Sequence, residues 1–311
     1  MKNIIKTIKG FILCFKYVKT YLKYGLYYSG RKNNLSYKIL LVVHAIEKGL
    51  GIKETRLGFG SQKINDLLYF LNEWEHQNYS LEDYSYVYAI NVLKSYVEFH
   101  RAKQYNSPFI EKLQTFLKDR NVFEIKSGFR IYDANYDRKD LISLITNRHS
   151  IRDYADKEVS KEDIVECIRL ALTAPSACNR QPSRCYYTMD KSKIEKIGDL
   201  IPGNTGFNNV NNYLVITADI SAFGIQEYTQ WMTNAGIFIT YLTLIMEYKG
   251  IANCILQWAN RGNSEKELRE LLNIPENEQV VAAISLGYPN ADCKILESKR
   301  RAIEEVGKEV F

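Results

Sequence analysis

Two short stretches decide the fold of this chain: Arg148-His149-Ser150-Ile151-Arg152 and Pro175-Ser176-Ala177-Cys178-Asn179-Arg180-Gln181-Pro182. In the first stretch two arginines flank a serine, and their guanidinium groups and the hydroxyl are donors suited to a phosphate. In the second stretch Asn179 and Gln181 carry amides, whose donors and acceptors can read the edge of a flat heterocycle. A phosphate clamp followed by an amide-bearing loop predicts a phosphorylated cofactor with a polar ring.

Each stretch has a simpler interpretation when it is taken alone. The first could be a solvated basic turn, and the second a proline-bounded loop with ordinary turn chemistry. In this order, with a short helix between them, they resemble the opening of the nitroreductase family of FMN-dependent oxidoreductases. The resemblance covers residues 141–311 and implies an α+β fold, with a nitroreductase-like mixed or antiparallel sheet flanked by helices. It also implies FMN as cofactor, NAD(P)H as reductant, a small-molecule substrate and a homodimer with the flavin at the subunit interface.

By the same resemblance, one set of residues contacts FMN. Arg148, Ser150 and Arg152, with an arginine near the chain end, would hold the phosphate. Asn179 and Gln181 would bond the ring or ribityl chain, and the strand over residues 251–258 would approach the ring. For the arginines near the chain end, a solvated charge run is the alternative. The full set of expected contacts is Arg148, His149, Ser150, Arg152, Pro175, Ser176, Asn179, Gln181, Leu256, Gln257, Arg300 and Arg301.

The bound flavin would carry the redox chemistry, so no catalytic side chain is expected. One departure from the family pattern concerns the residues after Gln181-Pro182. The family usually has an aromatic residue there, whereas this chain has Ser183 and Arg184. The change predicts a more open or more charged pocket, and a polar or anionic substrate in place of a typical nitroaromatic one.

Composition fits a cytoplasmic enzyme. The 311 residues suffice for one large domain or two ordinary ones, and the apolar fraction of 46% supports a packed core. The net charge of +6 suits an anionic cofactor or an anionic membrane surface. No nucleic-acid motif is present, so no nucleic-acid partner is expected. The six cysteines are scattered and form no C-x-x-C pair, which predicts free thiols and no metal site.

The N-terminal residues 1–30 predict a basic amphipathic helix. Within residues 2–28, Lys2, Lys6, Lys9, Lys16, Lys19 and Lys23 fall on one helical face, and Ile4, Ile8, Phe11, Phe15, Val18, Leu22 and Leu26 on the other. The run from Phe11 to Phe15 is too short to span a membrane, and no signal-peptide cleavage site follows it. Two alternatives remain: the apolar face packs on the rest of the protein, or it lies on the inner face of the cell membrane.

Residues 31–139 predict a mainly helical module, with a polar linker over residues 120–140. His44 and Glu47 share a helical face, which favours a structural hydrogen bond between them over a metal pair that lacks a third ligand. The stretch His44-x-x-Glu47-Lys48-Gly49-Leu50, with Arg56-x-Gly58-Phe59-Gly60, resembles the N-terminal extension of bacterial nitroreductase-like proteins. Those proteins are associated with surface-polysaccharide clusters, so the resemblance implies a bacterial origin. The third unit is the FMN-binding domain, residues 140–311.

Periodicity and capping signals predict the elements of residues 140–311. Ser160, with Asp163 three residues on, is a helix N-cap, and Ile164, Cys167, Ile168, Ala171 and Leu172 form the core face of that helix. Residues 198–212 are expected to be irregular. The other predicted helices cover residues 140–146, 226–248 and 265–272, and the predicted strands cover 185–189, 213–218, 251–258 and 280–286.

Three functions remain open. The first is an FMN-dependent oxidoreductase that passes electrons from NAD(P)H to a small substrate. The second is a non-catalytic or weakly catalytic adaptor in bacterial surface-polysaccharide biosynthesis, although an adaptor would not need the phosphate and amide stretches. The third keeps the flavin but changes the reaction, to reductive dehalogenation or flavin breakdown, which related family members perform.

Overall fold

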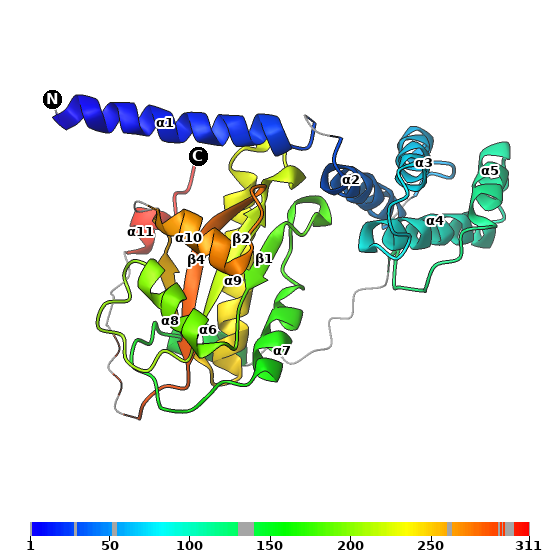
Figure 1. The fold of residues 1–311 in the computed structure, drawn as a ribbon. Helices are drawn as coiled ribbons and strands as arrows, with labels where there is room; N and C mark the ends of the chain where they lie inside the picture. Colours follow the sequence, from blue (N-terminus) through cyan, green and yellow to red (C-terminus); the bar gives the residue numbers. More distant parts are fainter. Residues whose placement is uncertain are drawn as a thin grey trace.

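The chain combines a helical N-terminal half with a C-terminal half built on one sheet (Figure 1). The computed structural model describes residues 2–27, 30–51, 55–129, 140–259, 263–291, 293, 295 and 302–310. The C-terminal half mixes helices with strands, as the predicted α+β class requires. Among the described residues, no helix is both long and apolar enough to cross a membrane.

The sheet has four strands in the order β1-β2-β4-β3. They are β1 (Ser183–Tyr186), β2 (Asn212–Asp219), β3 (Ala252–Gln257) and β4 (Glu278–Gly287), and each neighbouring pair is antiparallel. β2 is buried along its whole length. Of the two sheet types that were expected, mixed and antiparallel, these described strands form the antiparallel one.

Helices cover both faces of the sheet. Alternate side chains of β2 point to opposite faces, as strand geometry requires. Leu214 and Ile216 pack with α7 (Lys161–Ala171) and α9 (Gln230–Tyr248). Tyr213 and Val215 pack with α8 (Lys191–Leu200) and α10 (Ser264–Leu272) on the other face. The result is a three-layer domain in which α9 lies across one face of the sheet.

The expected N-cap of α7 is confirmed, since the Ser160 hydroxyl accepts a hydrogen bond from the Asp163 N–H. Other boundaries differ from expectation. The helix predicted over residues 226–248 begins at Gln230, after the short 3-10 turn η3 (Ile225–Glu227), and the strand predicted over 185–189 occupies 183–186. The predicted irregular stretch begins inside α8, a helix for which no prediction was made. Leu172 lies beyond the end of α7 and is exposed, so its assignment to the core face is wrong.

The N-terminal half forms the expected helical module. It contains α2 (Lys32–Leu50), α3 (Ser61–His76), α4 (Tyr84–Ala102) and α5 (Pro108–Leu117). Their apolar faces enclose a core around Trp74 and Tyr96. α2 contributes Ile39 and Val43 to that core. Its Tyr37 and Leu40 instead enter a second cluster with Phe223, Trp231 and other residues of the sheet domain. α2 therefore belongs to both halves of the chain.

Glu47 does not bond His44, so the expected hydrogen bond between them is wrong. The Glu47 carboxylate accepts hydrogen bonds from the Tyr88 hydroxyl at 2.7 Å and from the Gly128 N–H at 2.9 Å. Both partners lie farther along the chain, on α4 and in the segment that follows α5. The spacing of residues within one helix cannot predict contacts with such distant partners. Glu47 thus ties that segment to the helices of the module.

The amphipathic helix α1 (Lys2–Tyr24) forms as expected, but its apolar face is not covered. Tyr21 and Tyr24, near its end, are buried, and so is Leu26 just beyond it. Phe11 and Phe15 are 73% and 69% exposed. The alternative in which this face packs on the rest of the protein is therefore wrong for most of the helix. Two further helices, α6 (Asp140–Asn147) and α11 (Ile303–Val306), complete the described helices longer than a single 3-10 turn.

Candidate flavin site

The loop between α7 and β1 has an unusual backbone. It contains the 3-10 turn η1 (Ala177–Asn179), and three non-glycine residues in it have positive φ: Cys178 at 50°, Asn179 at 52° and Gln181 at 50°. This left-handed conformation is costly for L-residues and persists only where the surroundings enforce it. The strain falls within the stretch predicted to contact a cofactor ring. Such strain is common in segments that bind ligands.

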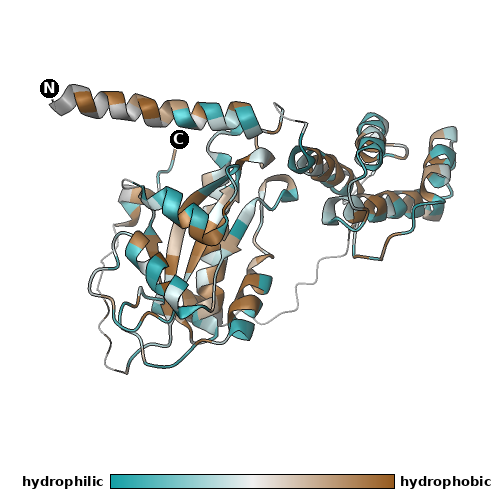
Figure 2. Cartoon of the chain, in the orientation of Figure 1, coloured by the Kyte–Doolittle hydropathy of each residue, from teal (hydrophilic) through white to brown (hydrophobic). Residues whose placement is uncertain are grey.

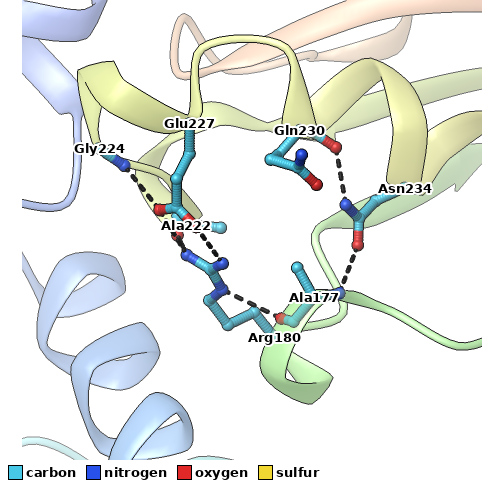
Figure 3. A network of polar contacts seen from close by, with 7 residues as sticks. All are labelled: Ala177, Arg180, Ala222, Gly224, Glu227, Gln230 and Asn234. Atoms are coloured by element: carbon cyan, nitrogen blue, oxygen red, sulfur yellow. Dashed lines mark hydrogen bonds and ion pairs between the residues drawn. The ribbon is translucent and has the colours of Figure 1, made fainter.

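A buried ion pair holds this loop (Figure 3). The Arg180 side chain is 1% exposed, and its Nη2 donates to Glu227 Oε1 at 2.6 Å. Its Nη1 donates to the Ala222 carbonyl at 2.5 Å, and its Nε to the Ala177 carbonyl at 3.0 Å. The hydrogen bonds from Arg180 hold the pKa of Glu227 below its usual range. The sequence prediction missed this pair, because 47 positions separate its members and nothing near Arg180 identifies the partner.

Two further contacts fix the ends of the loop. The Ser176 hydroxyl accepts a hydrogen bond from the Gln181 N–H at 3.0 Å and so closes the turn. Asn234, on α9, accepts from the Ala177 N–H at 2.8 Å and donates to the Gln230 carbonyl (Figure 3). The loop is thus anchored near the start of α9. Of the expected contacts in this stretch, Pro175 is exposed, while Ser176, Asn179 and Gln181 are half-buried.

The arginine stretch is anchored on β3. Ser150 forms an isolated parallel bridge with Asn253, and the Ile151 N–H donates to the Asn253 carbonyl at 3.1 Å. The Arg152 guanidinium bonds the Ser150 carbonyl at 3.1 Å. Arg148 Nη1 is buried but has no hydrogen-bond partner within the described residues. A buried guanidinium donor without an acceptor is costly, so this atom is well suited to an anionic ligand.

The two stretches do not meet within one chain. The loop over residues 175–182 contacts α9 at Asn234. Arg148 and His149 lie near Glu247, at the other end of the helix: burial raises the pKa of Glu247, and the positive charges of Arg148 and His149 oppose that rise. Asn234 and Glu247 are about 20 Å apart along an α-helix. A single chain therefore presents the expected phosphate contacts and the expected ring contacts at opposite ends of α9.

The remaining expected cofactor contacts lie in a buried position, in an exposed position and in a segment outside the described residues. Leu256 is 5% exposed and packs in the core on the α8 and α10 face of the sheet, away from α9. Gln257, its neighbour on β3, is exposed. Arg300 and Arg301 lie outside the described residues.

Arg184, which follows Ser183 after the Gln181-Pro182 pair, joins the sheet domain to the helical module. Its guanidinium donates to the Gln181 and Ser183 carbonyls and to the Tyr37 hydroxyl, at 2.9, 3.0 and 3.1 Å. Tyr37 in turn donates to Asp219 at 3.1 Å. These contacts give Arg184 a structural role in docking α2, which its position in the sequence did not reveal.

The helical module also reaches the strained loop. Gln181 Nε2 donates to the Tyr84 hydroxyl, at the start of α4, at 3.3 Å. A cavity of about 290 Å³ lies at this junction, and residues of α2, α4 and the loop line it. A second cavity, of about 280 Å³, lies between α7 and the loop, and Ser176, Gln181 and Phe238 are among its lining residues. Gln181 therefore lines both cavities.

The sequence and structure of this chain are similar to those of several known proteins. A model described as the nitroreductase family matches residues 145–208. A protein of Archaeoglobus fulgidus named for NADH dehydrogenase and NAD(P)H nitroreductase is 31% identical over 163 residues, which cover 52% of this chain and 93% of that protein. The FMN reductase [NAD(P)H] of Bacillus subtilis is 27% identical over 48% of this chain and 66% of its own. The solved FMN-dependent nitroreductase of Clostridium difficile is 27% identical, with a TM-score of 0.47, over 55% of this chain and 100% of its own.

Proposed function

Because this chain belongs to the nitroreductase family, we propose that it is an FMN-dependent oxidoreductase that passes electrons from NAD(P)H to a small-molecule substrate. The observation that carries the proposal is the buried Nη1 of Arg148, which has no hydrogen-bond partner among the described residues and lies in the stretch expected to hold the phosphate. The FMN reductase named among the relatives supports the choice of cofactor. When bound, FMN would supply the two-electron redox chemistry that links the nicotinamide to the acceptor.

The residues of this chain would bind and orient the cofactor. Arg148 and Arg152 would offset the charge of the phosphate, and Ser150 would donate a further hydrogen bond. Asn179 and Gln181 would present their amides to the ring or ribityl chain. The Arg180–Glu227 pair would act as a positioning element, since it fixes the backbone that carries both amides. In this proposal these side chains bind and orient the cofactor and do not act as proton donors or acceptors.

We further propose a homodimer, because one chain separates the two halves of the site. If two α9 helices pack antiparallel, the 148–152 stretch of one subunit lies beside the 175–182 loop of the other. The outer face of α9 is suited to this contact: Met232 is 45% exposed, Tyr241 is 38% exposed, and nothing lies within 4 Å of a Cβ placed on Gly236. A small residue at this position lets a second helix approach closely.

The cofactor assignment can be tested by titration with FMN and with riboflavin, which lacks the phosphate. Arg148→Ala removes a charge-assisted contact of about 1.5–3 kcal/mol, so the Kd for FMN should rise roughly 10- to 150-fold. The Kd for riboflavin should not change. The matched control is Arg169→Ala, on the exposed surface of α7, which should affect neither ligand. If Arg148→Ala weakens both ligands equally, the phosphate assignment is wrong; if neither ligand binds the unmodified protein, the enzyme proposal fails.

The dimer can be tested by placing a large charged side chain on α9. Gly236→Arg should lower the mass measured by sedimentation equilibrium and abolish FMN binding in the same preparation, because the site would be shared. Gly30→Arg is a matched control, since nothing lies within 4 Å of a Cβ on Gly30 either. A Gly236→Arg protein that is monomeric but still binds FMN tightly would refute the shared site.

The association with surface-polysaccharide synthesis stays a prediction. The arginine and amide stretches favour the enzyme over the adaptor, because an adaptor has no use for a buried cationic donor or a strained amide loop.

A further inference from the structure

Helix α1 carries an exposed apolar stripe between Ile8 and Leu22. Figure 2 shows hydrophobic segments that recur along this helix. Ile8, Phe11, Phe15, Val18 and Leu22 recur at intervals of three and four residues and therefore share one side of the helix. They are 53%, 73%, 69%, 43% and 53% exposed. From Ile8 to Leu22 the stripe is about 21 Å long. An exposed apolar surface of this size on a folded protein usually marks an interaction site.

The positive charge of α1 indicates a partner with a negatively charged surface. α1 contains six lysines and no acidic residue, while the whole chain has a net charge of +6. Lys23 pairs with Glu276, at 2.6 Å. Lys16 and Lys19 are exposed and form no ion pair with any described residue. The partner should therefore combine an apolar interior with a negatively charged surface.

The helix is fixed to the body of the protein at one end. The Tyr21 hydroxyl donates to the Tyr228 carbonyl at 2.9 Å, the Tyr24 hydroxyl donates to Glu276, and the Leu26 N–H donates to the Phe223 carbonyl. Figure 1 shows α1 running across one end of the sheet domain as a long straight helix. Because its C-terminal end is anchored, the helix holds its apolar stripe in a defined direction relative to the sheet domain.

We propose that α1 lies in the surface of an anionic phospholipid membrane, parallel to its plane, and holds the protein there. The apolar stripe would enter the boundary between headgroups and acyl chains, and the lysines would contact the lipid phosphates. A second copy of the chain is a poorer partner for the stripe, because paired α1 helices would bring their lysines together with no acidic residue on either helix. The proposal does not depend on the flavin assignment.

Co-sedimentation with vesicles tests the proposal on the full chain. Vesicles of phosphatidylglycerol and phosphatidylcholine should bind the protein, whereas pure phosphatidylcholine vesicles should bind it far more weakly. Phe11→Asp/Phe15→Asp should abolish binding. Phe123→Asp, at a position that is 60% exposed elsewhere, should leave it unchanged.

A second pair of variants tests the contribution of the lysine charges to membrane binding. Lys16→Gln/Lys19→Gln should weaken binding to anionic vesicles about 25-fold, or about fivefold per lysine. Lys193→Gln/Lys196→Gln, at exposed positions of α8, is the matched control and should have no effect.

Three outcomes would overturn the proposal. One is failure of the unmodified protein to bind anionic vesicles, and another is equal binding by the Phe11→Asp/Phe15→Asp variant. The third is a fall in the lipid-free mass of that variant, which would show that a second copy covers the stripe. Thermal melting of each variant confirms that it is folded, since the substituted side chains are exposed and should not alter the midpoint.

Discussion

Glu227→Gln should destabilise the protein substantially, although glutamine has nearly the same shape as glutamate. The substitution leaves the Arg180 guanidinium, whose side chain is 1% exposed, without its counter-charge. Removing one partner of a buried ion pair typically costs 3–5 kcal/mol. The lower end applies here, because the Glu227 side chain is 34% exposed and water already screens part of the interaction. We therefore expect a loss of about 3 kcal/mol of unfolding free energy.

Urea denaturation, followed by tryptophan fluorescence, measures this loss. With a slope of about 3 kcal/mol per molar urea, the midpoint should fall by about 1 M. A second substitution sharpens the test. Arg180→Met removes the buried charge itself, so the double variant Arg180→Met/Glu227→Gln should recover at least about 1 kcal/mol relative to Glu227→Gln alone.

The reasoning would be refuted by a Glu227→Gln midpoint close to that of the unmodified protein. It would equally be refuted if the double variant lost the sum of the two single effects, because then the two side chains would not act as a pair. Glu166→Gln provides the control. Glu166 pairs with Arg169 on the solvent side of α7, where the ion pair is open to water, and no change in midpoint is expected.

Three further predictions concern titration and burial. Arg180 holds the pKa of Glu227 low, so the stability that this carboxylate contributes is present above about pH 4.5. This contribution is lost as the pH falls through the pKa of Glu227 in the folded protein. The urea midpoints of the unmodified and Glu227→Gln proteins should therefore converge as the pH is lowered from 6 to 3. Burial raises the pKa of the Cys167 thiol to about 11, so thiol labelling at pH 8 should modify the exposed Cys14 quickly and Cys167 only after unfolding. Tyr154→Phe should cost about 1–2 kcal/mol in urea denaturation, because the fully buried Tyr154 hydroxyl bonds the Ile151 carbonyl and Ser285.

Local patterns in the sequence predicted the elements that local physics controls. The Ser160 cap depends on residues three positions apart, and it forms as expected. The strand predicted over 213–218 and the helix predicted to end at Tyr248 also follow from short-range composition, and Gly250, with φ of +72°, follows the end of that helix. α8 escaped prediction because its apolar positions are few and polar residues separate them.

Features that depend on distant residues could not be predicted in this way. The strained loop was recognised by its residue types, but the Arg180–Glu227 pair that holds it joins two segments far apart in the sequence. The separation of the two stretches along α9 depends on where β3 and the start of α9 lie in space. The exposure of Phe11 and Phe15 is likewise a tertiary outcome, because an amphipathic pattern gives no information about what covers its apolar face.

The double role of α2 has a consequence for how the chain can unfold. Asn34 on this helix is fully buried and donates to the Tyr24 and Ser221 carbonyls, while Ile39 and Val43 pack into the core of the helical module. Neither half can lose its tertiary packing without exposing a face of the same helix. The two halves should therefore melt in one cooperative transition, and calorimetry should record a single heat-absorption peak across both.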